Sequence, residues 1–258
     1  MAPRVPLRAS TEAYASGVPW YYAVAERDHE LQNPTSPAKI RLLGERLRLG
    51  PETRVLDMAC GSGGPAIQLA GAFGCRILGV ERSPEFVARG HERVAAAGLE
   101  ELIEIVEADA KEFPLEPESF DVALCLGASF AWDGLPGTLA ALAPAVRSGG
   151  HVVVGEPYWR TWPLPEGVDD INAVTLLETV RRFEAAGLAV VTLIASSDDD
   201  WDTYESLHWR ALEEWLVESP GDPDAPGIRA RHLANRDAYL SIERALLGWA
   251  IFATRKRS

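Results

Sequence analysis

A strand, a glycine turn and a helix follow one another at residues 55–70, and this succession constrains the fold more than any other part of the chain. Val55 and Leu56 are typical of the end of a buried strand, and Asp57 then places a carboxylate at its carboxyl end. The glycines that follow permit a tight turn in which a ligand can approach bare backbone. Pro65 suits the first position of a helix, where its missing N–H costs nothing. The pattern predicts the first half of a βαβ nucleotide-binding unit.

The glycine spacing alone is ambiguous. Gly61-x-Gly63-x-x-Ala66 also fits the G-x-G-x-x-G/A pattern of enzymes that bind NAD or FAD. Asp57 discriminates between the two kinds of cofactor, because it lies four residues before the first turn glycine. A carboxylate there would repel a pyrophosphate and attract a cofactor with a cationic amino acid end.

Strands and helices alternate along the rest of the chain. The expected strands cover residues 54–57, 75–80, 103–107, 120–126, 151–155, 188–195 and 248–255. The expected helices cover residues 65–72, 84–98, 135–146, 201–218 and 228–240. Residues 148–150 are expected as a turn, and Pro144 should bend the helix that contains it. This rhythm predicts an α/β fold with a doubly wound, mostly parallel sheet and helices on both faces.

Three stretches carry a resemblance to a known family. The segment 57–63, D-M-A-C-G-S-G, resembles motif I of the class I S-adenosylmethionine (SAM) methyltransferases. Residues 120–123, F-D-V-A, are similar to that family's fourth strand, and residues 147–150 stand where the family often has L-K-P-G-G. Ala59 departs from the pattern, since the family most often has glycine there, and alanine is tolerable if its φ is negative. Residues 156–159 are similar to a bacterial subgroup that acts on small molecules.

The resemblance implies a seven-stranded sheet whose antiparallel last strand lies between the fifth and sixth strands, with a helical cap above it. We expect the cap at residues 1–50, as two or three short helices, and the class I core at residues 51–258. A helical insertion is expected at about residues 200–240. The cap carries a cluster of aromatic residues, namely Tyr14, Trp20, Tyr21 and Tyr22.

The resemblance also implies SAM as the cofactor, bound at the carboxyl ends of the first strands. Glu81 suits acceptance of both ribose hydroxyls, with a solvated surface carboxylate as the alternative. Asp109 and the N–H of Ala110 suit the adenine edge. The expected cofactor-binding residues are Asp57, Ala59, Cys60, Gly61, Ser62, Gly63, Glu81, Arg82, Asp109, Ala110 and Leu126.

Methyl transfer by in-line displacement requires alignment of the acceptor atom, the methyl carbon and sulfur, and exclusion of water. A general base is needed only if the acceptor carries its proton. The expected catalytic residues are His29 in the cap, Glu156 at the end of the fifth strand and Trp132 after the fourth strand. A packing histidine and a structural carboxylate are the alternatives for the first two. His208, between Leu207 and Trp209, is expected to pack rather than to catalyse.

The pocket over the cofactor is expected to be aromatic and to be built by the cap and the inserted helices together. Rigid rings form apolar walls and attract cations through their faces. Packing between cap and core is the alternative role for at least half of the tryptophans expected in this pocket. The tryptophans concerned are Trp20, Trp132, Trp159, Trp162, Trp201 and Trp209.

Composition limits the partners. The chain has 25 Lys and Arg against 38 Asp and Glu, a net charge of −13, which argues against nucleic acid. Its apolar runs are too short to cross a membrane, and residues 1–10 lack the apolar core of a secretory signal. No cluster has metal-ligand spacing, so no metal is expected. Cys60, Cys75 and Cys125 are expected as reduced, buried thiols of a cytoplasmic protein.

The sequence therefore predicts a SAM-dependent methyltransferase that acts on a small molecule, with a homodimer left open. The residues do not identify the acceptor atom. A SAM-binding regulator without turnover, a protein methyltransferase and an NAD-dependent oxidoreductase are the alternatives. The chain after the fourth strand, residues 126–130, lacks the N/D-P-P-Y/F motif of DNA amino methyltransferases.

Overall fold

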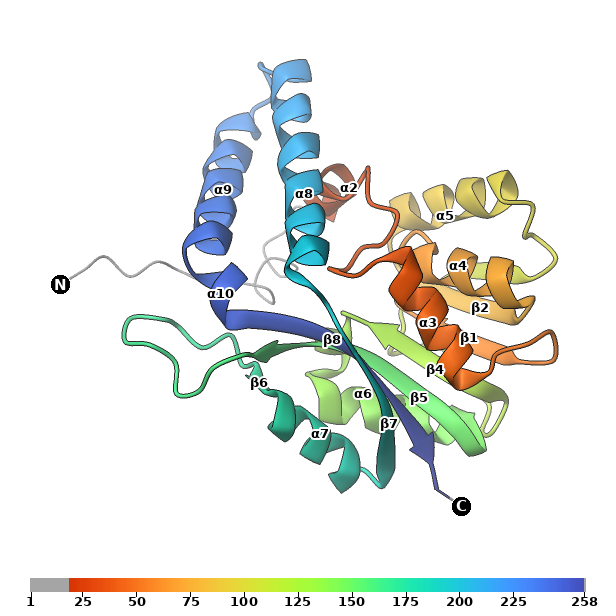
Figure 1. Ribbon diagram of the computed structural model, residues 1–258. Coiled ribbons are helices and arrows are strands. Elements are labelled where there is room, and N and C mark those ends of the chain that lie inside the picture. Colours follow the sequence, from red (N-terminus) through yellow and green to blue (C-terminus); the bar gives the residue numbers. More distant parts are fainter. Residues whose placement is uncertain (1–18, 258) are drawn as a thin grey trace.

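The computed structural model describes residues 19–257, with side chains from Tyr21 onward, and its centre is an eight-stranded sheet. The strand order is β3-β2-β1-β4-β5-β8-β7, and the short β6 pairs with β5 off this path. Figure 1 shows the sheet with its helices. The strands are β1 (Arg54–Met58), β2 (Arg76–Glu81), β3 (Ile103–Glu107), β4 (Phe120–Leu126), β5 (Val146–Trp159), β6 (Val174–Thr175), β7 (Leu188–Ala195) and β8 (Leu247–Lys256).

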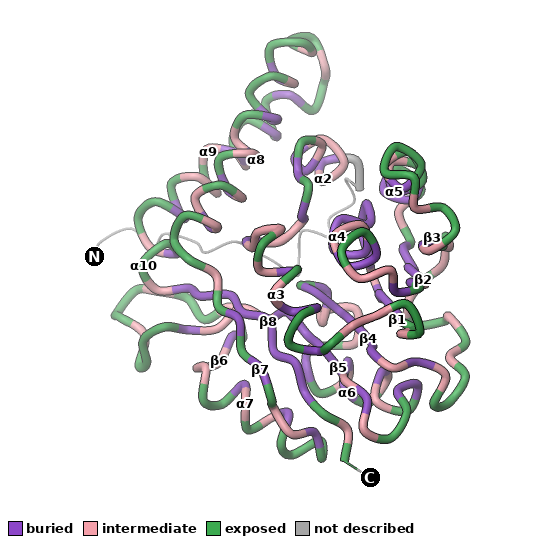
Figure 2. The backbone as a smooth tube through the Cα atoms, turned by 45° about the vertical axis from the view of Figure 1, so that its right-hand side comes forward, coloured by how far each residue is buried: buried purple, intermediate pink, exposed green. Residues whose placement is uncertain are grey.

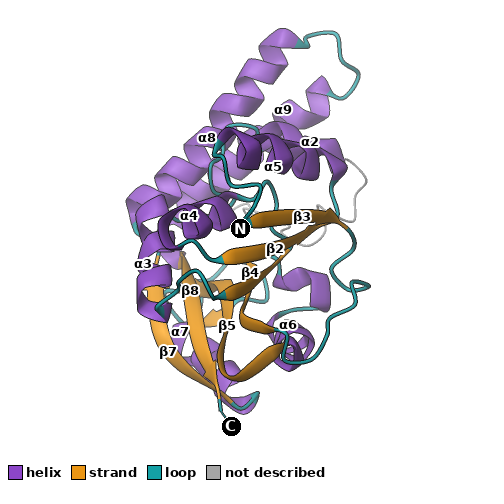
Figure 3. Ribbon diagram, turned by 90° about the vertical axis from the view of Figure 1, so that its right-hand side faces the viewer, coloured by secondary structure: helices purple, strands orange, loops and turns teal. Residues whose placement is uncertain are grey.

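Helices cover both faces of the sheet (Figure 3). On one face lie α3 (Pro37–Leu47), α4 (Gly64–Phe73) and α5 (Pro84–Ala96), whose apolar residues form one core cluster with the strands. On the other lie α6 (Leu135–Leu142) and α7 (Leu176–Ala185), which form a second cluster. Central strands such as β1 and β4 are therefore buried on both sides, which explains their nearly continuous apolar sequences. The predicted doubly wound α/β sheet is confirmed.

Local signals set the helix boundaries. Gly63 precedes α4 with a φ of 75°, and Pro65 lies in its first turn as predicted. The Ser83 hydroxyl accepts a hydrogen bond from the Phe86 N–H and starts α5, also as predicted. The helix expected over 135–146 is shorter: α6 ends at Leu142, and a 3₁₀ turn, η2 (Ala143–Ala145), contains the proline. Proline removes a helical donor, so the chain leaves the α-helix there instead of bending within it.

The fifth strand is longer than residues 151–155. Its pairing with β4 jumps from Phe120↔Val146 to Val122↔His151, so the expected turn at 148–150 is a bulged excursion inside the strand. At the other end β4 stops at Leu126, but β5 continues because β8 pairs antiparallel with it up to Trp159. The antiparallel β8 lies between β5 and β7, as the resemblance implied.

Two helical parts lie beyond the strand–helix alternation. The first is α2 (Pro19–Ala25), and the second runs through α8 (Asp198–Glu218), α9 (Ala225–Ala238), the π-helix η3 (Tyr239–Glu243) and α10 (Arg244–Leu246). Helices α8 and α9 run side by side away from the sheet, and their far ends are largely exposed (Figures 1 and 2). Apolar residues of α2 pack against α8 and α9. Tyr21 and Ala25 of α2 form a cluster with Leu212 and Leu216 of α8 and Ile228 of α9. Tyr14 and the side chain of Trp20 lie outside the described residues.

Each cysteine lies in the interior, with Cys60, Cys75 and Cys125 all free and buried. Over residues 19–257, no helix is both long enough and apolar enough to cross a membrane. The same residues hold no group of His, Cys, Asp and Glu that could bind a metal ion.

Candidate active site

Two buried carboxylates lie side by side where the parallel strands end. Asp57 on β1 is 2% exposed, and Glu81 ends the neighbouring strand β2 at 8% exposure. Open parallel sheets bind ligands at the carboxyl ends of their strands. The loop after β1, residues 59–63, contacts Glu81 through the Gly61 N–H. The carboxyl ends of these strands are the candidate cofactor site.

The loop has an unusual backbone. Ala59, Gly61 and Gly63 have φ values of 56°, 56° and 75°, and the Cys60 N–H donates to the Val80 carbonyl at 3.1 Å. The condition that we set for Ala59, a negative φ, is therefore not met. A left-handed conformation costs an L-residue with a Cβ about 1–2 kcal/mol. The loop holds Ala59 in a conformation that glycine adopts more easily.

The Glu81 carboxylate organises the loop from below. Its Oε2 accepts a hydrogen bond from the Gly61 N–H at 3.0 Å, and its Oε1 accepts from the N–H groups of Arg82 and Ser83, both at 2.9 Å. Burial raises its pKa above the usual value despite these three bonds. Glu81 is thus no surface acid, although the bonds it makes here are to the chain's own backbone.

Asp57 has an unmet hydrogen-bonding capacity. Its Oδ2 is buried and has no hydrogen-bond partner among the described residues. Burial, and then the nearby Glu81, raise the pKa of Asp57 to about 7. Buried polar atoms are nearly always satisfied, so an orphaned carboxylate oxygen beside a glycine loop fits a cationic ligand group. The unpartnered acceptor oxygen of Asp57 therefore suits the ammonium end of SAM.

The remaining predicted cofactor residues surround this pair. Leu126 ends β4, and its carbonyl accepts a hydrogen bond from the Asn33 Nδ2 at 3.0 Å. Asp109 is exposed after β3, where its Oδ1 accepts from the Lys111 N–H at 2.8 Å, and Ala110 is half-buried. Arg82 is exposed at the end of β2. The structure thus brings the predicted residues to one edge of the sheet.

A segment from before the core lies across the glycine loop. We call residues 26–34 the covering segment. The Gln32 Oε1 accepts hydrogen bonds from the Ser62 N–H at 2.6 Å and from its hydroxyl at 3.1 Å. A Cβ at Gly61 would lie 2.0 Å from that oxygen, and one at Gly127 would lie 2.0 Å from the Asn33 Oδ1. These two glycines admit the covering segment to the strand ends.

Sequence analysis missed Gln32 and Asn33. Residues 33–37 contain one Asn and two Pro, which are frequent in turns, so their sequence alone gives no sign of a binding role. The partners Ser62 and Leu126 lie 30 and 93 residues away along the chain, so no spacing pattern could reveal the contacts.

His29 lies in the covering segment and is 3% exposed. Its Nε2 lies 2.9 Å from the Tyr204 carbonyl on α8, and its ring lies 4.3 Å from the His208 ring, centroid to centroid. Burial, and then His208, lower the pKa of His29 to about 4. A carbonyl only accepts, so Nε2 carries the proton and Nδ1 of the neutral ring does not. That Nδ1 is buried without a partner among the described residues.

Glu156 lies on β5, and Trp132 lies in the short helix that follows β4. Trp132 is half-buried in the 3₁₀ helix η1 (Ser129–Trp132) that follows β4. The Glu156 side chain is hydrogen-bonded to Ser129, and its Oε1 is buried without a partner in the described chain. Burial raises the pKa of Glu156 to about 7. The hydrogen bond and ring contacts of His29 lead instead to Tyr204 and His208 on α8.

The tryptophans are dispersed. Trp159 is buried and donates from its Nε1 to Asp170 at 3.0 Å, whereas Trp162 is 57% exposed. Trp201 is buried and stacks on Tyr239 at 6.2 Å between ring centroids. At least Trp159 and Trp201 therefore fill the core instead of facing a ligand.

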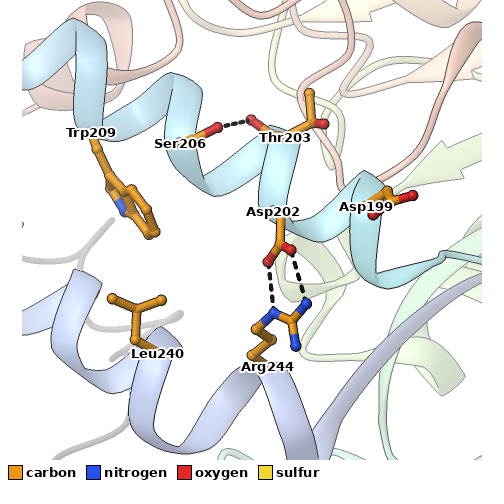
Figure 4. A pocket seen from close by; sticks show the side chains of 7 residues that line it. All are labelled: Asp199, Asp202, Thr203, Ser206, Trp209, Leu240 and Arg244. Atoms are coloured by element: carbon orange, nitrogen blue, oxygen red, sulfur yellow. Dashed lines mark hydrogen bonds and ion pairs between the residues drawn. The ribbon is translucent and has the colours of Figure 1, made fainter.

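A hollow between α8 and the π-helix η3 lies apart from the predicted cofactor residues (Figure 4). Arg244 donates to both carboxylate oxygens of Asp202, at 2.8 and 2.9 Å, and the Tyr239 hydroxyl donates to Asp202 at 2.6 Å. These bonds fasten η3 and α10 to α8. The residues lining the hollow are Asp199, Asp202, Thr203, Ser206, Trp209, Leu240 and Arg244.

Comparisons with known proteins agree with this geometry. Residues 55–150 match the model of a methyltransferase domain. The uncharacterized protein YjhP of Escherichia coli (strain K12) is 31% identical over 243 residues, 92% of this chain and 98% of the relative. The crystal structure of a SAM-dependent methyltransferase from Geobacter sulfurreducens in complex with S-adenosyl-L-homocysteine has a TM-score of 0.87 and 32% identity, covering 93% of this chain and 99% of that one. The 27-O-demethylrifamycin SV methyltransferase of Amycolatopsis mediterranei is 30% identical over 163 residues, 63% of this chain and 57% of that one.

The sheet order, the inserted antiparallel β8 and the glycine loop above two buried carboxylates define a Rossmann-like, cofactor-dependent enzyme. The chain belongs to the class I SAM-dependent methyltransferases, and SAM is its cofactor.

The backbone of Ala59 generates a first prediction. Ala59→Gly should relieve about 1–2 kcal/mol of left-handed strain. The greater entropy of unfolded glycine offsets about 0.5–1 kcal/mol of this, so we expect a net gain in unfolding free energy of up to about 1.5 kcal/mol. Urea denaturation measures the change. The control is Ala88→Gly on the exposed face of α5, which should instead lose about 1 kcal/mol. A loss of equal size in both variants would contradict the strain.

The raised pKa of Asp57 generates a second prediction. The native carboxyl titrates at about 7 and the unfolded one near 4, so the native state binds the extra proton between these values. Wild-type stability should therefore fall as pH rises from about 4 to about 7. Asp57→Asn carries no charge, so its stability relative to the wild type should rise over that interval, while its affinity for S-adenosylhomocysteine should fall. Urea denaturation across the pH range tests the stability, and calorimetry tests the affinity. A stability difference between Asp57→Asn and the wild type that stays constant with pH would refute the raised pKa of Asp57.

Proposed function

We propose that this methyltransferase acts on a small molecule by in-line displacement. The observation that carries the proposal is the covering segment, which lies across the glycine loop through Gln32 and across the end of β4 through Asn33. A closed cover over the strand ends favours a small acceptor over a protein substrate. The acidic net charge of −13 argues in the same direction against nucleic acid. The relative that methylates 27-O-demethylrifamycin SV, by its name, supports a small acceptor as well.

The predicted cofactor residues receive roles from their positions. The Asp57 carboxylate attracts the ammonium end, and the Glu81 carboxylate retains lone-pair capacity for ribose hydroxyls beside its three backbone bonds. The loop residues and Leu126 supply backbone contacts, and Asp109 with Ala110 lies where the adenine edge is expected. SAM supplies a methyl group already activated by its sulfonium. The chain's own task is then to orient the acceptor and to exclude water.

On the acceptor side, His29 is the proposed proton acceptor. Its buried Nδ1 is unprotonated at neutral pH and has no partner in the described chain, as an acceptor of a substrate proton requires. Glu156 is proposed to orient the acceptor through its unpartnered Oε1. Trp132, on the same short helix as the Ser129 that bonds Glu156, is proposed as a wall of the pocket.

The cofactor roles are tested on Glu81. Glu81→Ala should weaken binding of S-adenosylhomocysteine by about 1.5–3 kcal/mol, because hydrogen bonds to a charged group are lost. Isothermal calorimetry measures the affinity. The control is Glu107→Ala, since Glu107 is the exposed β3 neighbour of Glu81 in the strand register and should leave affinity unchanged. Equal effects in both variants would remove Glu81 from the cofactor site, and tight NAD binding by the wild type would oppose the assignment.

The acceptor class is tested with methyl-labelled SAM and a cell extract divided into small-molecule and protein fractions. We expect label in the small-molecule fraction. Label in the protein fraction would mean a protein substrate, and binding without transfer to either fraction would mean a regulator without turnover. In the same assay His29→Ala should lower turnover by about a hundredfold or more, because general bases contribute about a hundredfold to ten-thousandfold, and it should leave S-adenosylhomocysteine affinity within about twofold. Unchanged turnover would show that His29 only packs.

A further inference from the structure

Gln32 links the glycine loop to a buried carboxylate outside the core. Its Oε1 accepts the Ser62 N–H at 2.6 Å, and its Nε2 donates to Glu26 Oε2 at 2.5 Å. Glu26 is 7% exposed and belongs to the covering segment. One amide therefore connects the cofactor loop with a group that is six residues earlier in the chain.

The two partners fix the orientation of this amide. The Ser62 N–H can only donate, so the amide oxygen faces the loop, and the NH₂ group at the other side of the amide donates to Glu26. The bridge thus needs one acceptor and one donor on the same side-chain end. Methionine of similar length provides neither hydrogen bond, and an ionised glutamate provides acceptors only.

The loop needs such a restraint. Ser62 lies between Gly61 and Gly63, both with positive φ, so the loop backbone has more conformational freedom than other residues would allow. Arg93 of α5 holds the same residue from another side, donating to the Ser62 hydroxyl at 2.7 Å and to its carbonyl at 3.3 Å. Gln32 and Arg93 together fix the residue at the centre of the loop.

Glu26 itself contacts two helices, α8 and α5. Its Oε1 lies 3.5 Å from the Tyr204 hydroxyl and 3.8 Å from the His208 Nε2, both on α8. Arg89 of α5 donates to the Glu26 carbonyl at 3.2 Å. The titratable and charged groups around Glu26 are His29, Arg89, Tyr204 and His208, and on the Gln32 side Arg93 donates to the Ser62 hydroxyl that Gln32 also contacts. The bridge from Gln32 to Glu26 is therefore attached to α8.

We infer that Gln32 is a positioning residue, which holds the Ser62 N–H and so keeps the glycine loop in the conformation that binds SAM, and that Glu26 orients it. The inference concerns the cofactor loop, so it stands independently of the nature of the acceptor. Its consequence is that part of the cofactor site is built by the covering segment and by α8.

The first test is Gln32→Met, with binding of S-adenosylhomocysteine measured by calorimetry. Losing the bridge and leaving the Ser62 N–H without its partner should weaken affinity between about fivefold and a hundredfold. The control is Gln68→Met on α4, since Gln68 also donates to the covering segment, at Glu30, but on the exposed outer side. The control should bind within about twofold of the wild type. Equal affinity in Gln32→Met and the wild type would overturn the inference.

The second test separates positioning from general structural support. In Gln32→Glu a protonated carboxyl would again offer one donor and one acceptor, while an ionised one would face the Glu26 carboxylate. Two adjacent carboxyls share a proton at low pH and lose it as pH rises. The affinity of Gln32→Glu, divided by that of the wild type at the same pH, should therefore approach one at low pH and fall as pH rises. Dividing by the wild type removes the titration of Asp57 and Glu81, which both proteins share.

A ratio that does not change with pH would overturn the positioning role even if Gln32→Met binds weakly. The Gln68→Glu control should give a constant ratio. Failure of the wild type to bind S-adenosylhomocysteine at any pH would instead overturn the cofactor site, and this inference with it.

Discussion

Three backbone N–H groups converge on the buried carboxylate of Glu81, and the cofactor edge of the sheet depends on this contact. It ties the end of β2 to the loop after β1 at Gly61, so the loop is shaped by the neighbouring strand and not by its own sequence alone. Burying a carboxylate is costly unless donors surround it. The three N–H groups satisfy Glu81, whereas Asp57 keeps one oxygen without a partner among the described residues. One acid therefore builds the loop, and the other remains available for a ligand.

Sequence reasoning succeeded where structure is decided locally. The strands at 103–107, 120–126 and 188–195 have the predicted bounds, and Ser83 caps the predicted helix, because strand periodicity and caps act over a few residues. It failed where the partner is distant in the chain. The extension of β5 to Trp159 depends on pairing with β8, and the contact of Gln32 with Ser62 depends on a fold that brings the two together. The glycine turn was therefore predictable from a motif, whereas the contacts that Gln32 and Asn33 make with the core were not.

The covering segment and α8 meet in a polar joint that is nearly closed to solvent. Glu26 and His29 of the segment face Tyr204 and His208 of the helix, and all of these contacts join parts of the chain more than 170 residues apart. A buried polar joint gives less net stability than apolar packing, but it accepts only one register. Such a joint suits an enzyme that must place an acceptor against a methyl group with little positional error.

The place of β8 in the sheet has a consequence for synthesis of the protein. β8 pairs with both β5 and β7, yet it leaves the ribosome after them and after the long α8–α9 excursion. Until it emerges, the nascent chain exposes one hydrogen-bonding edge of β5, together with the apolar surface that β8 will cover. Exposed strand edges invite association with other chains during slow, non-local folding. The nascent protein is therefore most vulnerable to aggregation late in translation, when nearly all of its helices are already made.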